Sequence, residues 1–122
     1  MRSLLIVGSV FAALSVLLGA FGAHGLKNRL SIEDLAIFET AVRYQMYHAL
    51  GILFMGLASF DLTEKLVSFP AYFLILGIIV FSGSLFLLVF TNLRWFGAIT
   101  PIGGLCLIIG WLLFAYNIYF HA

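Results

Sequence analysis

Charged side chains are rare along this chain, and they separate four long uncharged runs. The runs cover residues 3–26, 44–60, 66–93 and 95–122. A helix needs about 20 apolar residues to cross the hydrocarbon core of a membrane, and each run supplies most or all of that length. The pattern therefore predicts four membrane-spanning helices, at about residues 4–23, 41–60, 70–91 and 101–119.

The first connection carries signals for the end of one helix and the start of the next. Gly25 is expected to end the first helix, because glycine adopts the left-handed conformation at little cost. Ser31 with Asp34 three residues later resembles a capping box in which Asp replaces the usual Glu. We therefore expect the second helix to begin near Ile32, with its first turns at the membrane surface.

Proline marks the expected starts of the third and fourth helices. It fits the first turn of a helix, where its missing N–H would have no partner anyway. Pro70 follows shortly after Ser68, and Pro101 comes directly after Thr100. Since all the connections are short, consecutive helices are expected to be antiparallel neighbours. The predicted fold is all-α, a four-helix transmembrane bundle with short loops.

The composition excludes several classes of protein. Hydrophobic residues make up 64% of the 122 positions and charged residues only 9%, against roughly 25% charged residues in an average soluble domain. So few charges cannot cover the surface of a soluble globule, and we expect one integral membrane domain, 1–122. The net charge is +1. Because no basic cluster exists, nucleic acid is excluded as a partner, and membrane lipid is the expected one.

Basic residues favour one orientation in the membrane. Arg2 and Lys65 lie on the side of both chain termini. The two connections on the other side hold more basic residues: Lys27, Arg29 and Arg94, with Arg43 nearby. Cytoplasmic loops carry the excess of Lys and Arg in membrane proteins, so both termini are expected outside the cytoplasm.

Small residues recur on one face of the first predicted helix, at steps of three and four: Gly8, Ala12, Ser15, Gly19 and Gly22. The fourth predicted helix carries a second set: Gly103, Gly104, Gly110 and Trp111. Small residues at such spacings let two helices approach closely in lipid. The partner of each face is either another helix of the same chain or a second copy, so a homo-oligomer stays open.

Polar side chains on the second predicted helix form the most informative pattern. At about 100° per residue, one face of this helix carries Thr40, Tyr44, Gln45 and His48. His48 lies about 10 Å inside the membrane by helix rise, where a polar group needs a hydrogen-bond partner. The expected partners are His24, Ser82 and Ser84.

Two hypotheses for this polar cluster stay open. It is either a structural network that holds the helices together or a site for binding or proton handling, since histidine titrates near neutral pH. Glu39 and Arg43 point almost the opposite way on the same helix. We expect them to form an i,i+4 ion pair at the membrane surface.

The sequence offers no set of residues for a cofactor or a catalytic site. A haem would need His24 and His48 at one depth, but helix rise separates them by about 10 Å. A zinc site needs about three or four ligands, whereas the three histidines lie at different depths and Cys106 is remote. Paired carboxylates, an activated nucleophile and a phosphate loop are lacking. We therefore expect no cofactor, no metal and no enzymatic activity.

Four segments, in order along the chain, carry a resemblance to a known family. They are Gly19–Leu26, Phe38–Leu50, Phe81–Leu85 and Thr100–Leu105, the last followed by Gly110 and Trp111. The set resembles the YgdD-like family of small four-span membrane proteins (domain of unknown function 423) over essentially the whole chain. The resemblance implies a multi-pass protein of the bacterial cytoplasmic (inner) membrane without a defined biochemical activity. It also implies importance for His24 and for the polar face of the second helix.

The expected function follows from these patterns together. We expect a non-enzymatic integral inner-membrane protein whose polar cluster is structural or binds a small ligand or a lipid. The alternative is a transporter or channel component that acts as an oligomer, with the small-residue face of the first helix as the contact.

Overall fold

The computed structural model describes residues 2–121, with Ala23 described by its backbone alone. Within this range the chain is entirely helical apart from its connections, which confirms the predicted all-α class. The elements in chain order are α1 (Arg2–Leu17), a π-helical turn (Leu18–Gly22), α2 (Ala23–Leu26), α3 (Ile32–Ala58), α4 (Glu64–Thr91), a 3₁₀ turn (Arg94–Ala98) and α5 (Thr100–His121).

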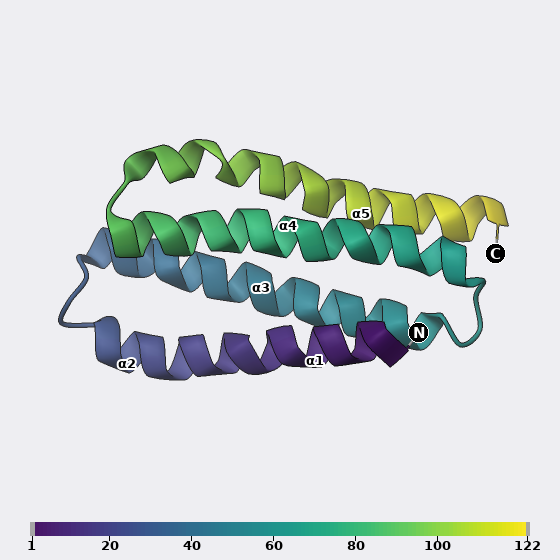
Figure 1. The fold of residues 1–122 in the computed structure, drawn as a ribbon, viewed down its shortest axis with the longest axis horizontal. Coiled ribbons are helices and arrows are strands. Elements are labelled where there is room, and N and C mark those ends of the chain that lie inside the picture. Colours follow the sequence, from purple (N-terminus) through teal and green to yellow (C-terminus); the bar gives the residue numbers. More distant parts are fainter. Residues whose placement is uncertain (1, 122) are drawn as a thin grey trace.

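The long helices lie side by side as an up-and-down row in chain order (Figure 1). α1, the π turn and α2 form one continuous helical rod, followed by α3, α4 and α5. α3 packs against α1 and α4, and α4 packs against α3 and α5. Both termini and the connection between α3 and α4 lie at one end of the bundle (Figure 1). We call this the terminal end, and the opposite one the loop end.

An apolar core runs through the middle of the row. Its buried members come from every long helix: Leu4, Ile52, Met55, Val67, Ala71, Leu74, Ile78, Leu107 and Phe114. The outer faces are also apolar, since large side chains such as Ile6, Leu57 and Leu112 are at least 60% exposed. Apolar surface of this extent is not stable in water and marks a membrane or protein partner.

In the part of the chain that the structure describes, three helical segments are long and apolar enough to cross a membrane. They are Arg2–Leu26, Glu64–Thr91 and Arg94–His121. α3 has a similar length of 27 residues, but its first half carries the charged residues of the helix: Glu33, Asp34, Glu39 and Arg43.

The predicted start of α3 is confirmed, whereas the predicted end of the first helix is wrong. α3 begins at Ile32, and the backbone N–H of Asp34 donates to the Ser31 hydroxyl at 3.1 Å. Gly25 does not take the left-handed conformation, because no described glycine has a positive φ. The helix instead continues through the π turn to Leu26. Asn92, with φ of 58°, provides the left-handed cap elsewhere, at the end of α4.

Proline starts one helix as predicted but lies inside another. α5 begins at Thr100, so Pro101 occupies its first turn as expected. The predicted start at Pro70 is wrong, because α4 begins at Glu64 after Thr63 in an extended conformation. Pro70 therefore lies in the helix interior, where it cannot donate a hydrogen bond to the carbonyl of Leu66 four residues earlier.

Candidate functional site

His48 is a buried histidine in the middle of α3, with only 7% of its surface exposed. Its ring Nδ1 lies 2.6 Å from the backbone oxygen of Tyr44, one turn earlier. A carbonyl oxygen only accepts, so Nδ1 must carry the proton and donate. In the neutral ring, Nε2 is then the unprotonated nitrogen and a hydrogen-bond acceptor.

The second ring nitrogen of His48 has no partner among residues 2–121. Nδ1 makes the only hydrogen bond of this side chain to any described residue. Across residues 2–121, no completely buried side-chain nitrogen or oxygen lacks a partner. Nε2 must therefore reach the accessible surface. The structure thus presents a hydrogen-bond acceptor on an otherwise apolar helix bundle.

Aromatic rings flank the imidazole of His48. The ring centroid of His48 lies 6.2 Å from that of Tyr44 and 6.0 Å from that of Trp111. Tyr44 stacks in turn on Phe81, with centroids 4.7 Å apart. Tyr44 and Trp111 are 40% and 38% exposed, so both rings contribute surface. We call Tyr44, His48, Phe81 and Trp111 the His48 face.

Glycine allows Trp111 of α5 to reach α3. A Cβ atom at Gly51 would lie only 2.7 Å from Cη2 of Trp111, well inside ordinary contact distance. Gly51 is three residues after His48 and therefore lies on the same side of α3. The absence of a side chain at position 51 thus brings the indole beside the imidazole.

The other buried polar residues of the predicted cluster bond to backbone carbonyls of neighbouring helices. Gln45 donates from Nε2 to the oxygen of Phe11 in α1 at 3.1 Å, and Ser82 of α4 donates to the oxygen of Ala41 in α3 at 2.7 Å. Ser15 donates to the same Phe11 oxygen at 2.8 Å. Gln45 and Ser82 therefore tie α1 to α3 and α3 to α4, whereas the bond from Ser15 stays within α1.

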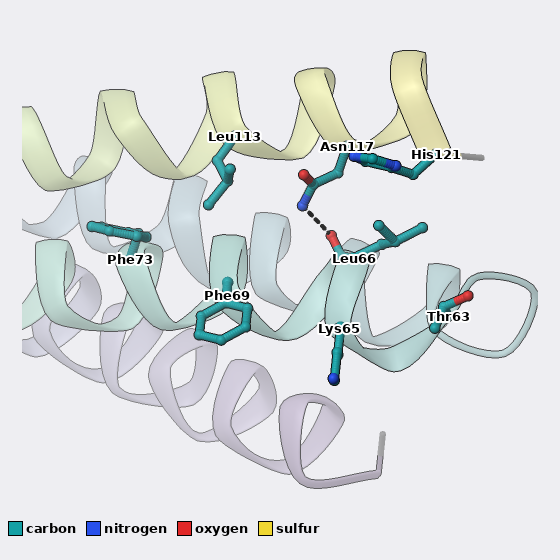
Figure 2. A pocket seen from close by; sticks show the side chains of 8 residues that line it. All are labelled: Thr63, Lys65, Leu66, Phe69, Phe73, Leu113, Asn117 and His121. Carbon is teal, nitrogen blue, oxygen red and sulfur yellow. Dashed lines mark hydrogen bonds between the residues drawn. The ribbon is translucent and has the colours of Figure 1, made fainter.

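Two further polar contacts tie α4 to α5. The hydroxyl groups of Ser84 and Thr100 are 2.5 Å apart. Near the terminal end, Asn117 donates from Nδ2 to the backbone oxygen of Leu66 at 3.0 Å (Figure 2). This oxygen is the one that Pro70 leaves without its usual helical donor. A side chain from α5 therefore replaces the hydrogen bond that proline removes from α4.

The remaining predicted polar residues lie apart from His48. His24 is exposed in α2 and is hydrogen-bonded to no other described residue. Thr40 donates to Ala36 of its own helix at 3.0 Å. Arg43 Nη2 lies 3.6 Å from Glu39 Oε2, and both side chains are about half exposed. The predicted residues thus form several separate contacts rather than one connected cluster.

The predicted small-residue faces pack within the chain at most of their positions. A Cβ at Gly8 would lie 2.8 Å from Leu53, and one at Gly22 would lie 2.4 Å from Phe38, so α1 and its π-helical extension pack against α3. Gly110 approaches Leu74 equally closely. Gly19 and Gly104 have more space, with nearest distances of 3.4 and 3.7 Å. Ser15 is buried, whereas Ala12 is half-buried.

The sequence did not predict an ion pair between Asp34 and Arg94 at the loop end, which we call the clasp. Arg94 donates from Nη1 and Nη2 to the two carboxylate oxygens of Asp34, at 2.8 and 3.1 Å. It also donates to Oδ1 of Asn92 at 2.6 Å. The hydrogen bonds from Arg94 lower the pKa of the Asp34 carboxyl below its usual value. Sixty positions separate the two partners, and no local pattern in the sequence indicates the pair.

The described residues hold no group of three or more His, Cys, Asp or Glu side chains suited to a metal ion. The chemistry that the His48 face offers is therefore that of an acceptor nitrogen beside flat aromatic rings, with the phenol hydroxyl of Tyr44 and the indole N–H of Trp111 as further polar groups. Such a surface can bind a hydroxyl group attached to an apolar body.

Comparison with known proteins defines the family. Residues 18–104 match the profile of a family described as protein of unknown function (DUF423). The chain is 48% identical over 113 residues to a UPF0382 membrane protein of Staphylococcus saprophyticus, and 41% identical over 118 residues to the UPF0382 membrane protein YwdK of Bacillus subtilis. Each alignment covers 93% of both chains. No solved structure matches the chain. This chain is therefore an integral membrane protein that belongs to the DUF423 family, whose function is unknown.

Proposed function

We propose that this protein is a non-enzymatic, four-pass protein of the bacterial cytoplasmic membrane that binds a small amphipathic molecule at the His48 face. The ligand carries a hydroxyl group, which donates to Nε2 of His48, and an apolar body, which lies against Tyr44 and Trp111. The single observation that carries this proposal is the acceptor nitrogen of His48 at the bundle surface without a protein donor.

The position of α3 in the row supports a fourth pass. α3 is flanked by α1 and α4, both long and apolar enough to cross a membrane. With 27 residues it is about 40 Å long at 1.5 Å per residue, so it spans alongside them. Its charged first half then lies at the loop end, with Asp34 held by Arg94.

The orientation places the loop end in the cytoplasm and both termini outside. The loop end carries Lys27, Arg29 and Arg94, whereas the terminal end carries Arg2 and Lys65, and basic residues are retained on the cytoplasmic side. Alkaline phosphatase fused after residue 122 is expected to be active, and a fluorescent protein that folds only in the cytoplasm is expected to be dark at the same position. The reverse pair of results would overturn this orientation.

A binding role is favoured over the other readings of the polar residues. Gln45, Ser82 and Asn117 are used in ties between helices, so they support a structural role. Nε2 of His48 has no such use, and an acceptor that faces the apolar part of a membrane without a donor is costly. A ligand hydroxyl group would remove this cost.

The channel or transporter alternative has less support. Its candidate contact, the small-residue face of α1, packs against α3 at Gly8 and against Phe38 at Gly22. The face is thus occupied within one chain. A binding protein needs no second copy to complete the His48 face, since all four residues come from one chain.

The experiment uses Trp111 as the reporter of binding. The chain has two tryptophans, so Trp95→Phe leaves Trp111 alone, and its fluorescence is quenched by a brominated probe that binds nearby. In detergent, a long-chain brominated alcohol is expected to quench at about fivefold lower concentration than a brominated alkane of equal length. One net hydrogen bond, worth about 1 kcal/mol, accounts for this factor.

His48 must be responsible for the difference between the two probes. In His48→Leu the alcohol is expected to lose its advantage, because the acceptor is gone while the side-chain volume is largely kept. His24→Gln is the matched control and should quench like the parent. Equal quenching by both probes in the parent, or an alcohol advantage that persists in His48→Leu, would contradict the proposal.

A further inference from the structure

A cavity of about 470 Å³ opens between α4 and α5 at the terminal end (Figure 2). Asn117, which belongs to this cavity, lies six residues beyond Trp111, about 9 Å farther along α5. The cavity is therefore separate from the His48 face. It is lined by two turns of each helix: Thr63, Lys65, Leu66, Phe69, Phe73, Leu113, Asn117 and His121.

The lining changes from polar to apolar with depth. Thr63 and His121 lie outermost, at the end of the bundle, and Lys65 follows in the first turn of α4 (Figure 2). Phe69, Phe73 and Leu113 line the deeper part. Eight residues separate Lys65 from Phe73, so the gradient extends over about 12 Å. This is the polarity profile of one leaflet of a membrane, from the headgroups into the hydrocarbon.

Polar groups with spare hydrogen-bonding capacity surround the mouth. Asn117 is only 9% exposed and uses Nδ2 on the oxygen of Leu66, while its Oδ1 accepts from no residue in the described part. Thr63 precedes α4 without a side-chain capping bond. Lys65 is exposed and forms no ion pair with any residue from 2 to 121.

A second hollow of about 140 Å³ shares two aromatic residues with this cavity. It is lined by Phe69, Tyr72, Phe73 and Leu76. Phe69 and Phe73 therefore border both spaces. Two apolar spaces that share Phe69 and Phe73, one of them with a polar mouth, match a molecule with two chains and one headgroup better than a single-chain or compact ligand.

We propose that this cavity binds one membrane phospholipid. The phosphate lies at the mouth beside Lys65, a hydroxyl or ammonium group of the headgroup donates to Oδ1 of Asn117, and the acyl chains run along Phe69 and Phe73. Figure 2 shows Lys65 extending away from α5, and its exposed stem is free to turn the ammonium group toward a phosphate.

Native mass spectrometry of the full chain, released from detergent, tests whether the positive charge of Lys65 at the mouth contributes to lipid binding. Phosphatidylglycerol is added at increasing concentration, and the one-lipid state is counted. Lys65→Gln is expected to weaken its binding about fivefold, which is the usual contribution of one lysine to anionic lipid. Lys27→Gln, an exposed lysine at the loop end, is the matched control and should leave binding unchanged. Equal losses in both variants would overturn the proposal.

The apolar part is tested by filling the cavity. Leu113→Trp is expected to remove the one-lipid state for every headgroup while Lys65 is intact, provided that the circular dichroism spectrum stays helical. Retention of the lipid by a helical Leu113→Trp variant would overturn the proposal.

Lipids that share the phosphate but differ in the headgroup identify the group that donates to Asn117. Phosphatidylglycerol and phosphatidylethanolamine both offer a donor to Asn117, whereas phosphatidylcholine offers none. Binding of phosphatidylcholine as tight as that of the other two would contradict the contact with Oδ1 of Asn117. The relative strength of the first two identifies whether a hydroxyl or an ammonium group occupies it.

Discussion

Gly103→Ala is expected to destabilise the protein more than the substitution of alanine for any other described glycine. A Cβ atom at position 103 would lie 2.3 Å from the backbone nitrogen and 2.7 Å from the Cα of Phe81. Backbone atoms in the middle of α4 cannot rotate away as a side chain can, so the two helices must separate. Overpacking of this kind costs about 1–3 kcal/mol.

The neighbouring glycine provides a matched control. At Gly104 the added atom would lie 3.7 Å from the ring of Phe81, which is ordinary van der Waals contact. Gly104→Ala is therefore expected to change the unfolding free energy by less than about 1 kcal/mol. Both variants can be compared by helical signal against denaturant in one detergent. Equal destabilisation by the two variants would show that α4 and α5 do not meet closely at Gly103.

The second large effect is expected for Asn117→Leu. This change leaves the oxygen of Leu66 without the donor that replaces the missing N–H of Pro70. A buried carbonyl without a partner costs about 1–3 kcal/mol. The variant should unfold at lower denaturant concentration than the parent, although leucine has a similar volume to asparagine and greater hydrophobicity.

A double-mutant cycle separates this cause from a simple loss of packing. In Pro70→Ala the residue at position 70 has an N–H group that can donate to Leu66 within the helix. Asn117→Leu should then cost less than half of what it costs in the parent. If the cost is the same in both backgrounds, Asn117 does not act by satisfying the oxygen of Leu66.

The sequence predicted the helices, with two boundaries misplaced, but not the partners of their polar residues. Runs without charge predicted the helical segments, because apolar length is a local property of the chain. The face with Gln45 and His48 also follows from helical periodicity. That Gln45 bonds to the oxygen of Phe11 does not follow, because every residue offers a carbonyl and no sequence pattern marks one of them.

Pro70 shows why one boundary was misplaced. Proline is most frequent in the first turn of a helix, so Ser68 and Pro70 resembled a start. The preference of proline for the first turn is overridden here, because Asn117, 51 positions away, donates the hydrogen bond to the backbone oxygen of Leu66. Only the packing of α5 on α4 explains why α5 carries a polar residue at position 117.

The same reason applies to the clasp at the loop end. Asp34 had a local role in the capping pattern at Ser31, and the structure assigns its carboxylate to Arg94 as well. Charge alone does not reveal such a pair in a chain with several basic residues on one side. Its geometry depends on the 3₁₀ turn that begins at Arg94.

The row arrangement of the helices also determines the order in which the protein can assemble. Because α3 packs on α1, α4 on α3 and α5 on α4, each new helix leaving the ribosome meets a packing partner already in the membrane. The bond from Gln45 to Phe11 can close when residue 58 has been made, and the bond from Asn117 to Leu66 closes last. Few contacts of a helix can form only after a much later segment has been synthesised, which favours fast folding. Truncation after α3 should therefore leave a stable helical hairpin. Loss of α1 should instead remove the helix against which α3 packs first.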